Sequence, residues 1–321
     1  MINQVQVRVP TPFINNLIYR YRTHTLPCAS LGEYSGGMKR LLPLLLSLFV
    51  VMPLMASEEY SAAYWDALIA KSKVEIRKDP RSAVAHYNLG VGYLEKGKAS
   101  IAIKSLEKAH RLNRNDPYAL SAIGSAYRMS GQPRAAIKHF KKALRLKPDF
   151  AKAHGNLGVV YIDVGRLDDA VRSLKKAVRL KPADAMFHDN LGVALLQKGR
   201  IKASIAAFEA SIKVDSDYAN AHHGLGIAYV EANRLGDALK AIKETIRLAP
   251  DGGKAHYNLG VVYELKGDKI KAEAAYREAE RLDPILVRAR DAGAGQGLER
   301  LTKPKASFRC PMPCPLKPKE N

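Results

Sequence analysis

Cysteine is scarce in this chain, with only Cys28, Cys310 and Cys314 among its 321 residues. A structural zinc site takes about four ligands, and neither a second cysteine pair nor a histidine stands near Cys310 and Cys314, so we expect no bound metal there. An exported protein could oxidise Cys310 and Cys314 to a disulfide, with each other or with a partner chain. The alternative is a solvated tail with free thiols.

The chain also lacks the short motifs that carry catalysis. It has no nucleophile elbow, phosphate-binding loop or metalloprotease motif, and no paired carboxylates outside the repeats described below. No remaining segment is long enough to form a second, catalytic domain. We therefore expect a protein that is not an enzyme and that uses no cofactor.

No hydrophobic run is long enough to span a membrane comfortably. The longest, residues 41–55, follows a basic pair after Met38, and residues 38–56 as a whole are typical of a secretory signal peptide. We expect cleavage after Ala56 and a periplasmic or otherwise exported mature chain; an uncleaved anchor at a membrane is the alternative. Residues 1–37 are expected to be disordered or untranslated.

Acidic residues are outnumbered, 31 against 52 lysines and arginines, which gives a formal net charge of +21. Ten bases between residues 104 and 176 form a candidate basic patch: Lys104, Lys108, Arg111, Lys138, Lys141, Lys142, Arg145, Arg172, Lys175 and Lys176. A face of one sign attracts an anionic polymer, lipid headgroups or an acidic protein. The alternative is an ordinary solvated face, because the helix dipole favours Lys and Arg near helix C-termini.

The most prominent feature that is present is a repeat. Six glycines recur at one constant, unbroken spacing, each preceded by Leu or Ile: Gly90, Gly124, Gly158, Gly192, Gly226 and Gly260. A Tyr follows three residues after each glycine, on the same helical face, except at Leu195. A second amphipathic helix follows in each repeat, after a Gly or, in one repeat, after Asn233, which predicts a left-handed turn. Each repeat is therefore expected to be a helical hairpin.

This pattern, with a period of about 34 residues, resembles the tetratricopeptide repeat. The resemblance implies an all-α, right-handed α-solenoid of six stacked hairpins, at residues 83–116, 117–150, 151–184, 185–218, 219–252 and 253–286. We expect residues 57–82 to form an N-terminal capping helix, 287–302 a C-terminal cap and 303–321 a disordered, basic, proline-rich tail. The fourth hairpin departs most from the pattern, and we expect it to be the least stable.

In the resembled family, the first helices of successive repeats line a concave groove that holds peptides. Four repeats place an asparagine just before the Leu-Gly pair, where its amide can both donate to and accept from an extended peptide backbone. With their neighbours, these give the candidate peptide-binding residues: Asn88, Asn156, Asn190, Asn258, Tyr87, His223 and Tyr257. The alternative is that this asparagine is a consensus residue that bonds locally.

Five repeats also share a histidine at one position: His86, His154, His188, His222 and His256. This regularity raises the question of a metal site. Neighbouring helices pack about 8 to 10 Å apart, which is too far for imidazoles from separate repeats to share one ion. We expect these histidines to pack as small rings.

Together these features predict a scaffold that binds a peptide or protein partner in its concave groove, in the cell envelope. One alternative is binding of an anionic envelope polymer or lipid headgroup through the basic patch. Another is a cytoplasmic nucleic-acid adaptor, which requires that the chain is not exported and is not the favoured reading. A noncatalytic subunit of a larger enzyme is also compatible with the sequence.

Overall fold

The computed structural model describes residues 62–284, and these residues contain helices and turns but no strand. They fall into two compact units, whose boundary follows Ser130. The predicted signal peptide, the C-terminal cap, the basic tail, residues 1–37 and all three cysteines lie outside the described residues and stay predictions. No helix in the described part is long and apolar enough to cross a membrane.

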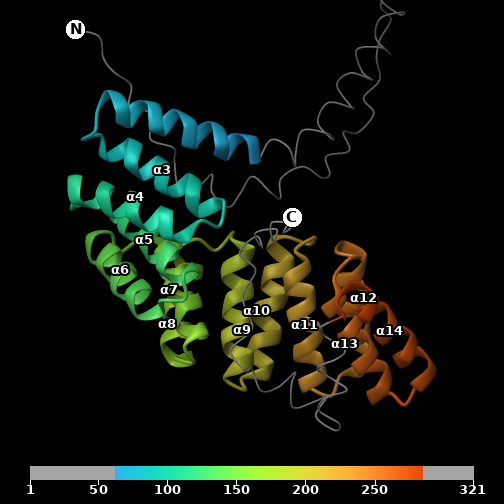
Figure 1. The fold of residues 1–321 in the computed structure, drawn as a ribbon. Helices are drawn as coiled ribbons and strands as arrows, with labels where there is room; N and C mark the ends of the chain where they lie inside the picture. The colour runs from blue at the N-terminus through green and yellow to red at the C-terminus, as the bar shows by residue number, and fades with distance from the viewer. Residues whose placement is uncertain (1–61, 285–321) are drawn as a thin grey trace, which may run out of the picture. The chain divides into compact units, whose positions relative to one another are not determined.

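The first unit begins with a helix that is described over residues 62–78, and three helices follow it (Figure 1): α3 (Ala83–Glu95), α4 (Ala99–Leu112) and α5 (Pro117–Met129). α3 packs against α4, and α4 packs against α5. Ile69 of the first helix lies so close to α3 that a Cβ added at Gly92 would come within 2.7 Å of its Cγ1. Trp65 packs against the same core, so this helix covers one end of the hydrophobic interior of the unit.

The second unit contains nine helices among its described residues: α6 (Pro133–Leu146), α7 (Ala151–Asp163), α8 (Leu167–Leu180), α9 (Ala185–Gln197), α10 (Ile201–Val214), α11 (Ala219–Glu231), α12 (Leu235–Leu248), α13 (Gly253–Leu265) and α14 (Lys269–Leu282). From α7 onward they form four hairpins. The first helices α7, α9, α11 and α13 contact one another in series, and α8, α10 and α12 each contact the first helix of the next hairpin. Figure 1 shows α9, α10 and α11 side by side. Stacked hairpins of this kind form an α-solenoid, as the sequence predicted.

Each hairpin turn contains a residue in the left-handed region, which confirms the prediction. The φ angle is 73° at Gly165 and 56° at Asn233. In the turn between α7 and α8, the Gly165 amide donates to the Ile162 carbonyl at 3.0 Å and the Arg166 amide donates to the Tyr161 carbonyl at 2.8 Å. These are the two hydrogen bonds of a Schellman motif, which satisfies carbonyls that a helix end leaves open. The same bonds recur at Gly97, Gly199, Asn233 and Gly267.

The glycine that defines the repeat lies where the two helices of a hairpin approach most closely. A Cβ added at Gly158 would lie 2.5 Å from Leu174 Cγ, and one added at Gly192 would lie 2.7 Å from the Phe208 ring. Leu174 and Phe208 have no exposed surface. The absence of a side chain at the glycine therefore lets the second helix place a large apolar residue against the backbone of the first.

The hairpin of α9 and α10 is the fourth repeat of the sequence, residues 185–218. It has buried serines where most other hairpins have alanine. Ser204 and Ser211 are both fully buried, but neither hydroxyl is unpaired. Ser204 donates to the Ile201 carbonyl at 2.8 Å, and Ser211 donates to the Ala185 carbonyl at 2.7 Å. The second bond ties α10 to the first residue of α9. The lower stability expected of this hairpin stays a prediction for hydrogen exchange to measure.

Candidate functional site

Two neighbouring repeat positions on the first helices hold the predicted peptide-binding residues. The earlier position is occupied by Tyr87 in α3, His223 in α11 and Tyr257 in α13. The later position is occupied by Asn88 in α3, Asn156 in α7, Asn190 in α9 and Asn258 in α13. Asn88, Asn190 and Asn258 are buried, and Asn156 is half-buried.

In the first unit, both predicted residues of α3 lie inside the fold. Tyr87 is only 8% exposed and belongs to the hydrophobic core cluster that also contains Val91 and Leu106. Asn88, the next residue, is 7% exposed. Asn190 and Asp189 of the second unit are still less exposed, at 2% and 3%, so burial does not separate the two units. What distinguishes the second unit is that its four first helices contact one another in series.

The structure brings two of the predicted residues together, His223 of α11 and Asn258 of α13. The amide Nδ2 of Asn258 lies 2.7 Å from Nε2 of His223. Burial, with a smaller contribution from the charge of Lys254, lowers the pKa of His223 to about 4. A neutral imidazole accepts a hydrogen bond at its unprotonated nitrogen, so the Asn258 amide is the donor. The contact joins the earlier position of one repeat to the later position of the next.

Asp189 of α9 occupies the same repeat position as His223, but the matching neighbour is missing. At the later position of the next repeat stands Gly224, which interrupts the series of asparagines. A Cβ at Gly224 would lie 2.4 Å from Cε1 of the fully buried Phe208 ring, so the packing excludes an asparagine there.

One oxygen of the Asp189 carboxylate has no partner among the described residues. The residue is 3% exposed, and its Oδ1 accepts no hydrogen bond from residues 62–284. Burial raises the pKa of Asp189 to about 7. Glu231, the last residue of α11, also has a buried unpaired oxygen, and burial raises its pKa. An unsatisfied buried acceptor costs about 1 to 3 kcal/mol, which a donor from a bound ligand would recover.

The last predicted aromatic, Tyr257 of α13, packs against its own hairpin. Its ring lies 5.4 Å from the ring of Tyr276 in α14, tilted by 56°. The Tyr276 hydroxyl donates to Oε2 of Glu264 at 2.6 Å, which fixes that ring in turn. Tyr257 is thus supported on one side by the core of the hairpin.

The five recurrent histidines each contact a backbone carbonyl six residues earlier, in the turn before the first helix. Their Nε2 atoms lie 2.9 to 3.2 Å from the carbonyl oxygens of Pro80, Pro148, Pro182, Ser216 and Pro250. Across residues 62–284, no group of three or more His, Cys, Asp or Glu side chains is arranged to hold a metal ion. The structure shows that these histidines contact the carbonyls of the preceding turns, and the packing role expected from the sequence stays a prediction.

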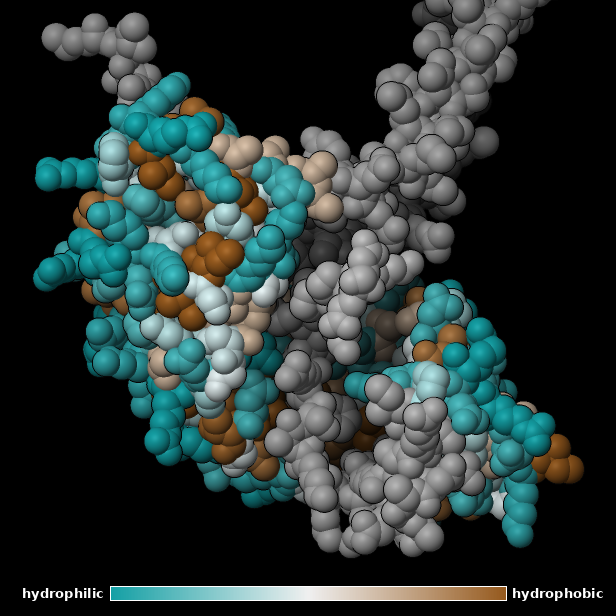
Figure 2. Space-filling view, viewed as in Figure 1, coloured by the Kyte–Doolittle hydropathy of each residue, from teal (hydrophilic) through white to brown (hydrophobic). Residues whose placement is uncertain are grey.

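The ten residues of the predicted basic patch lie on three second helices, α4, α6 and α8, and all are exposed or half-buried. Figure 2 shows hydrophilic side chains projecting at the outer edge over α4 and over α6. Arg172 of α8 pairs with Asp169, and Arg111 of α4 lies 4.0 Å from Glu107. Lys142 and Arg145 of α6 form no ion pair with the described residues, so much of this charge is not neutralised locally.

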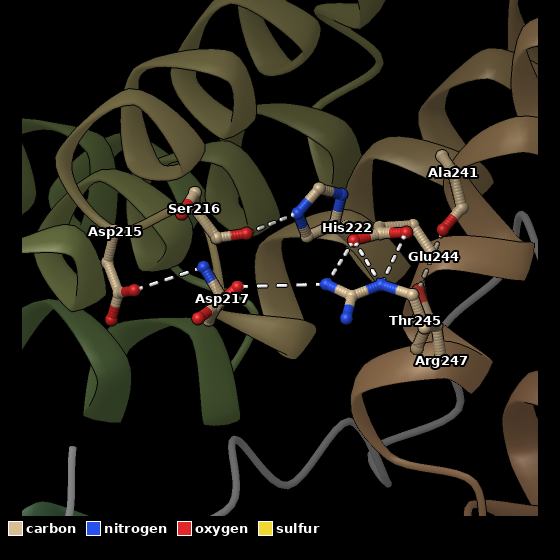
Figure 3. Close-up of polar contacts among 8 residues, drawn as sticks. All are labelled: Asp215, Ser216, Asp217, His222, Ala241, Glu244, Thr245 and Arg247. Carbon is tan, nitrogen blue, oxygen red and sulfur yellow. Dashed lines mark hydrogen bonds and ion pairs between the residues drawn. The ribbon is translucent and has the colours of Figure 1, made fainter. Parts of the chain in front are cut away.

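The corresponding end of α12 differs, because Glu244 stands where α4, α6 and α8 have lysine. Arg247 in the last turn binds Glu244, with Nη2 2.7 Å from Oε1, and lies 3.7 Å from Asp217 in the turn before α11 (Figure 3). The pKa of Glu244 is lowered, chiefly by its hydrogen bond with Arg247. In α14, Arg281 forms the same pair with Glu278 at 2.6 Å.

Sequence reasoning passed over two features of these surfaces. It did not place Lys73 and Arg77, from the helix at residues 62–78, beside the bases of α4, where they line one cleft. It also did not predict the unpaired oxygen of Asp189. The sequence did contain a signal. At the later position of the following repeat, His223 is matched by Asn258, whereas Asp189 is matched by Gly224.

Comparison with family models identifies the hairpins. Residues 127–191, 194–232 and 223–284 each match a model of the tetratricopeptide repeat. This part of the chain is therefore built of tetratricopeptide repeats, which confirms the resemblance drawn from the spacing. No curated protein sequence matches the chain.

Several solved structures share the fold. A chain of the APC/C hetero-tetramer Cut9–Hcn1 is similar over 77% of this chain, with 21% identity and a TM-score of 0.65, and this chain spans 48% of its length. Pseudomonas aeruginosa PilF is similar over 63% of this chain and 92% of its own, with 20% identity and a TM-score of 0.56. MamA is 30% identical over 52% of this chain and 97% of its own, with a TM-score of 0.47. The first two share the α-solenoid fold with this chain.

Proposed function

We propose that the inner helices of the second unit, α7, α9, α11 and α13, bind an extended segment of another protein. Tetratricopeptide repeats generally mediate protein–protein interactions, which supports a binding role rather than a catalytic one. The four helices contact one another in series, so side chains at one repeat position form a row along the stack.

The observation that carries this proposal is the unpaired, buried oxygen of Asp189. A leucine or alanine at this position would avoid the cost of burying a carboxylate, so the fold alone does not favour the residue. A backbone amide of an incoming segment would supply the missing donor to Oδ1. Asn156 of α7 is half-buried and Asn190 is 2% exposed; each amide has both donor and acceptor atoms, of the kind that an extended segment can bind.

We also propose that the protein works outside the cytoplasm. The support is the hydrophobic segment at residues 41–55 behind a basic pair, followed by polar residues from Ser57. N-terminal sequencing of the protein recovered from fractionated native cells tests this. A start near Ser57 in an envelope fraction is expected; a start at Met1 or Met38 in the cytoplasm would contradict export.

The binding proposal is tested with the double variant Asn156→Ala, Asn190→Ala. Proteins crosslinked to the full chain in its native cells are identified by mass spectrometry, and the affinity of the purified partner is measured by calorimetry. We expect affinity to fall about tenfold or more, because two amides that serve a peptide backbone are lost. The matched control is Asn115→Ala, Asn220→Ala, which removes two asparagines from other repeat positions and should leave the affinity unchanged.

Thermal unfolding of both double variants separates binding from folding. The proposal requires that the inner variant loses affinity while its melting temperature stays close to that of the wild type. If the affinity is unchanged and the melting temperature drops, the asparagines serve the fold and the proposal fails.

A further inference from the structure

A cleft in the first unit lies between the helix at residues 62–78, α3 and α4. Its volume is about 560 Å³, and it is open to solvent. Five cationic side chains line it: Lys73, Arg77, Lys104, Lys108 and Arg111. No lining residue is an acid. A site with this charge attracts an anion, and it does so at a place distinct from the inner helices of the second unit.

Little within the unit neutralises these cations. Glu107 is the one acid on α4; it accepts a hydrogen bond from the Tyr127 hydroxyl at 2.7 Å and lies 4.0 Å from Arg111. Lys73 lies 5.8 Å from the centre of the Tyr93 ring, a weak cation–π contact. The cations therefore repel one another, and a bound anion would relieve this repulsion.

The other lining residues indicate which kind of anion fits. Besides His86 and Ser105, two half-buried apolar side chains, Ile76 and Leu89, line the cleft together with the cations. A phosphate polymer would use the charges but leave this apolar surface in water. An acidic peptide can place carboxylates on the cations and an aliphatic side chain on Ile76 and Leu89. We propose that this cleft binds an acidic segment of a partner protein that carries an aliphatic residue between its carboxylates.

The same set of residues recurs two repeats later, within the second unit. The positions that correspond there to the five cations hold Lys141, Arg145, Arg172, Lys176 and Arg179. Those that correspond to Ile76 and Leu89 hold Leu144 and Leu157. These residues lie on α6, α7 and α8, which pack together as the helix at residues 62–78, α3 and α4 do. Leu144 is half-buried but Leu157 is buried, so the second set repeats the five charges and one accessible apolar side chain.

The next recurrence shows how the chain abolishes the site. After two more repeats, the corresponding positions hold Glu209, Lys213, Lys240, Glu244 and Arg247. There Arg247 is bound by Glu244 at 2.7 Å. The substitution Lys108→Glu copies this arrangement into α4, so it removes one cation, engages Arg111 and keeps a pairing that the fold already tolerates.

The test measures binding of a fluorescein-labelled, eight-residue peptide of Glu and Asp with one central Leu, by fluorescence anisotropy. Because the set on α6 and α8 would bind the same probe, all measurements use the full chain with Lys176→Glu. In that background we expect Lys108→Glu to weaken binding about tenfold. The matched control is Lys98→Glu, which makes the same charge change at the opposite end of α4, and it should leave the affinity within about twofold.

Two further probes decide the occupant. A peptide with Gln in place of every acid should not bind, and one with Gly in place of Leu should bind several-fold more weakly. The proposal is overturned if Lys108→Glu and Lys98→Glu have equal effects, or if the Leu-to-Gly change has none and inorganic polyphosphate competes as well as the peptide. Lys108→Gln, which removes one charge without reversing it, should give an intermediate loss; no loss with a folded Lys108→Gln and Lys108→Glu would also refute it. The Asn156→Ala, Asn190→Ala variant tests only the proposed binding to α7, α9, α11 and α13, so its result leaves the cleft proposal unaffected.

Discussion

Two pairs of second helices, α6 with α8 and α12 with α14, share a pattern of buried residues. They differ in how the charges on their outer surfaces are paired. At one buried position α8 has Leu174 and α12 has Ile242, and neither has any exposed surface. At one outer position α6 and α8 have lysine, Lys142 and Lys176, whereas α12 and α14 have glutamate, Glu244 and Glu278. The difference teaches that core and outer surface are specified by separate positions, so a basic surface can be created or removed without a change in the fold.

The largest expected effect tests whether the buried cores of the two kinds of hairpin are equally stabilising. Leu174→Ala and Ile242→Ala should each lower the free energy of unfolding by about 2 to 5 kcal/mol, because each leaves a cavity in a packed core. Urea unfolding of the two variants measures both losses. A loss confined to one hairpin would break the comparison, since it would mean that the basic and the mixed hairpins differ in their cores as well.

The next largest effect concerns Asp189, an unpaired charge on the first helix α9. Asp189→Asn should raise the free energy of unfolding by about 1 to 3 kcal/mol at about pH 8.5, because it removes a buried, unpaired carboxylate. The effect at about pH 5 should be small. The pKa of Asp189 is about 7 in the folded protein and 3.8 as the reference, so the folded state holds the proton between these values. The stability from this proton is present below about pH 4 and lost as the pH rises through about 7.

His223 supplies the control of opposite sign. Its folded pKa of about 4 lies below the reference value of 6.5, so its contribution is present above about pH 6.5 and lost as the pH falls toward 4. His223→Gln should therefore flatten the acid limb of the stability profile and leave the alkaline limb alone. Chemical denaturation over the pH range measures both limbs; an Asp189→Asn effect that is the same at both pH values would contradict the assignment.

The smallest effect comes from exchanging the outer charges themselves. Glu244→Lys should lower stability by about 0.3 to 1 kcal/mol, because it replaces an exposed ion pair with Arg247 by repulsion. Lys176→Glu should raise stability by a few tenths of a kcal/mol, since it places a carboxylate three residues before Arg179. Melting temperatures at low and high salt measure the pair, and both differences should shrink in high salt. A Glu244→Lys effect that does not change with salt would show that the pair is not acting through charge.

Much of the fold was predictable because the repeat states it many times over. The spacing of the glycines, the left-handed turns and the large residues such as Leu174 that face the glycines all follow local rules of helix geometry. The hydrogen-bond partners of polar side chains were harder to predict from the sequence. The hydrogen bonds of the recurrent histidines run to carbonyls in preceding turns, and no residue pattern specifies a carbonyl.

The candidate sites were harder to predict because each depends on a contact between repeats. That Asp189 lacks a partner follows from Phe208, which approaches Gly224 too closely for a side chain there. The basic cleft requires Lys73 and Arg77 to lie beside α4, which only the packing of the first unit establishes. Spacing within one repeat carries neither piece of information.

The constant lengths of the helices have a consequence for how this chain can change. In the second unit, every first helix has 13 residues and every second helix 14, and each contacts chiefly its immediate neighbours. Removing one whole repeat therefore joins surfaces that already fit one another. Removing a single residue within a helix turns everything after it by about 100° and faces charged side chains toward the core. The chain can thus gain or lose binding surface in whole hairpins, while it tolerates almost no slip within one.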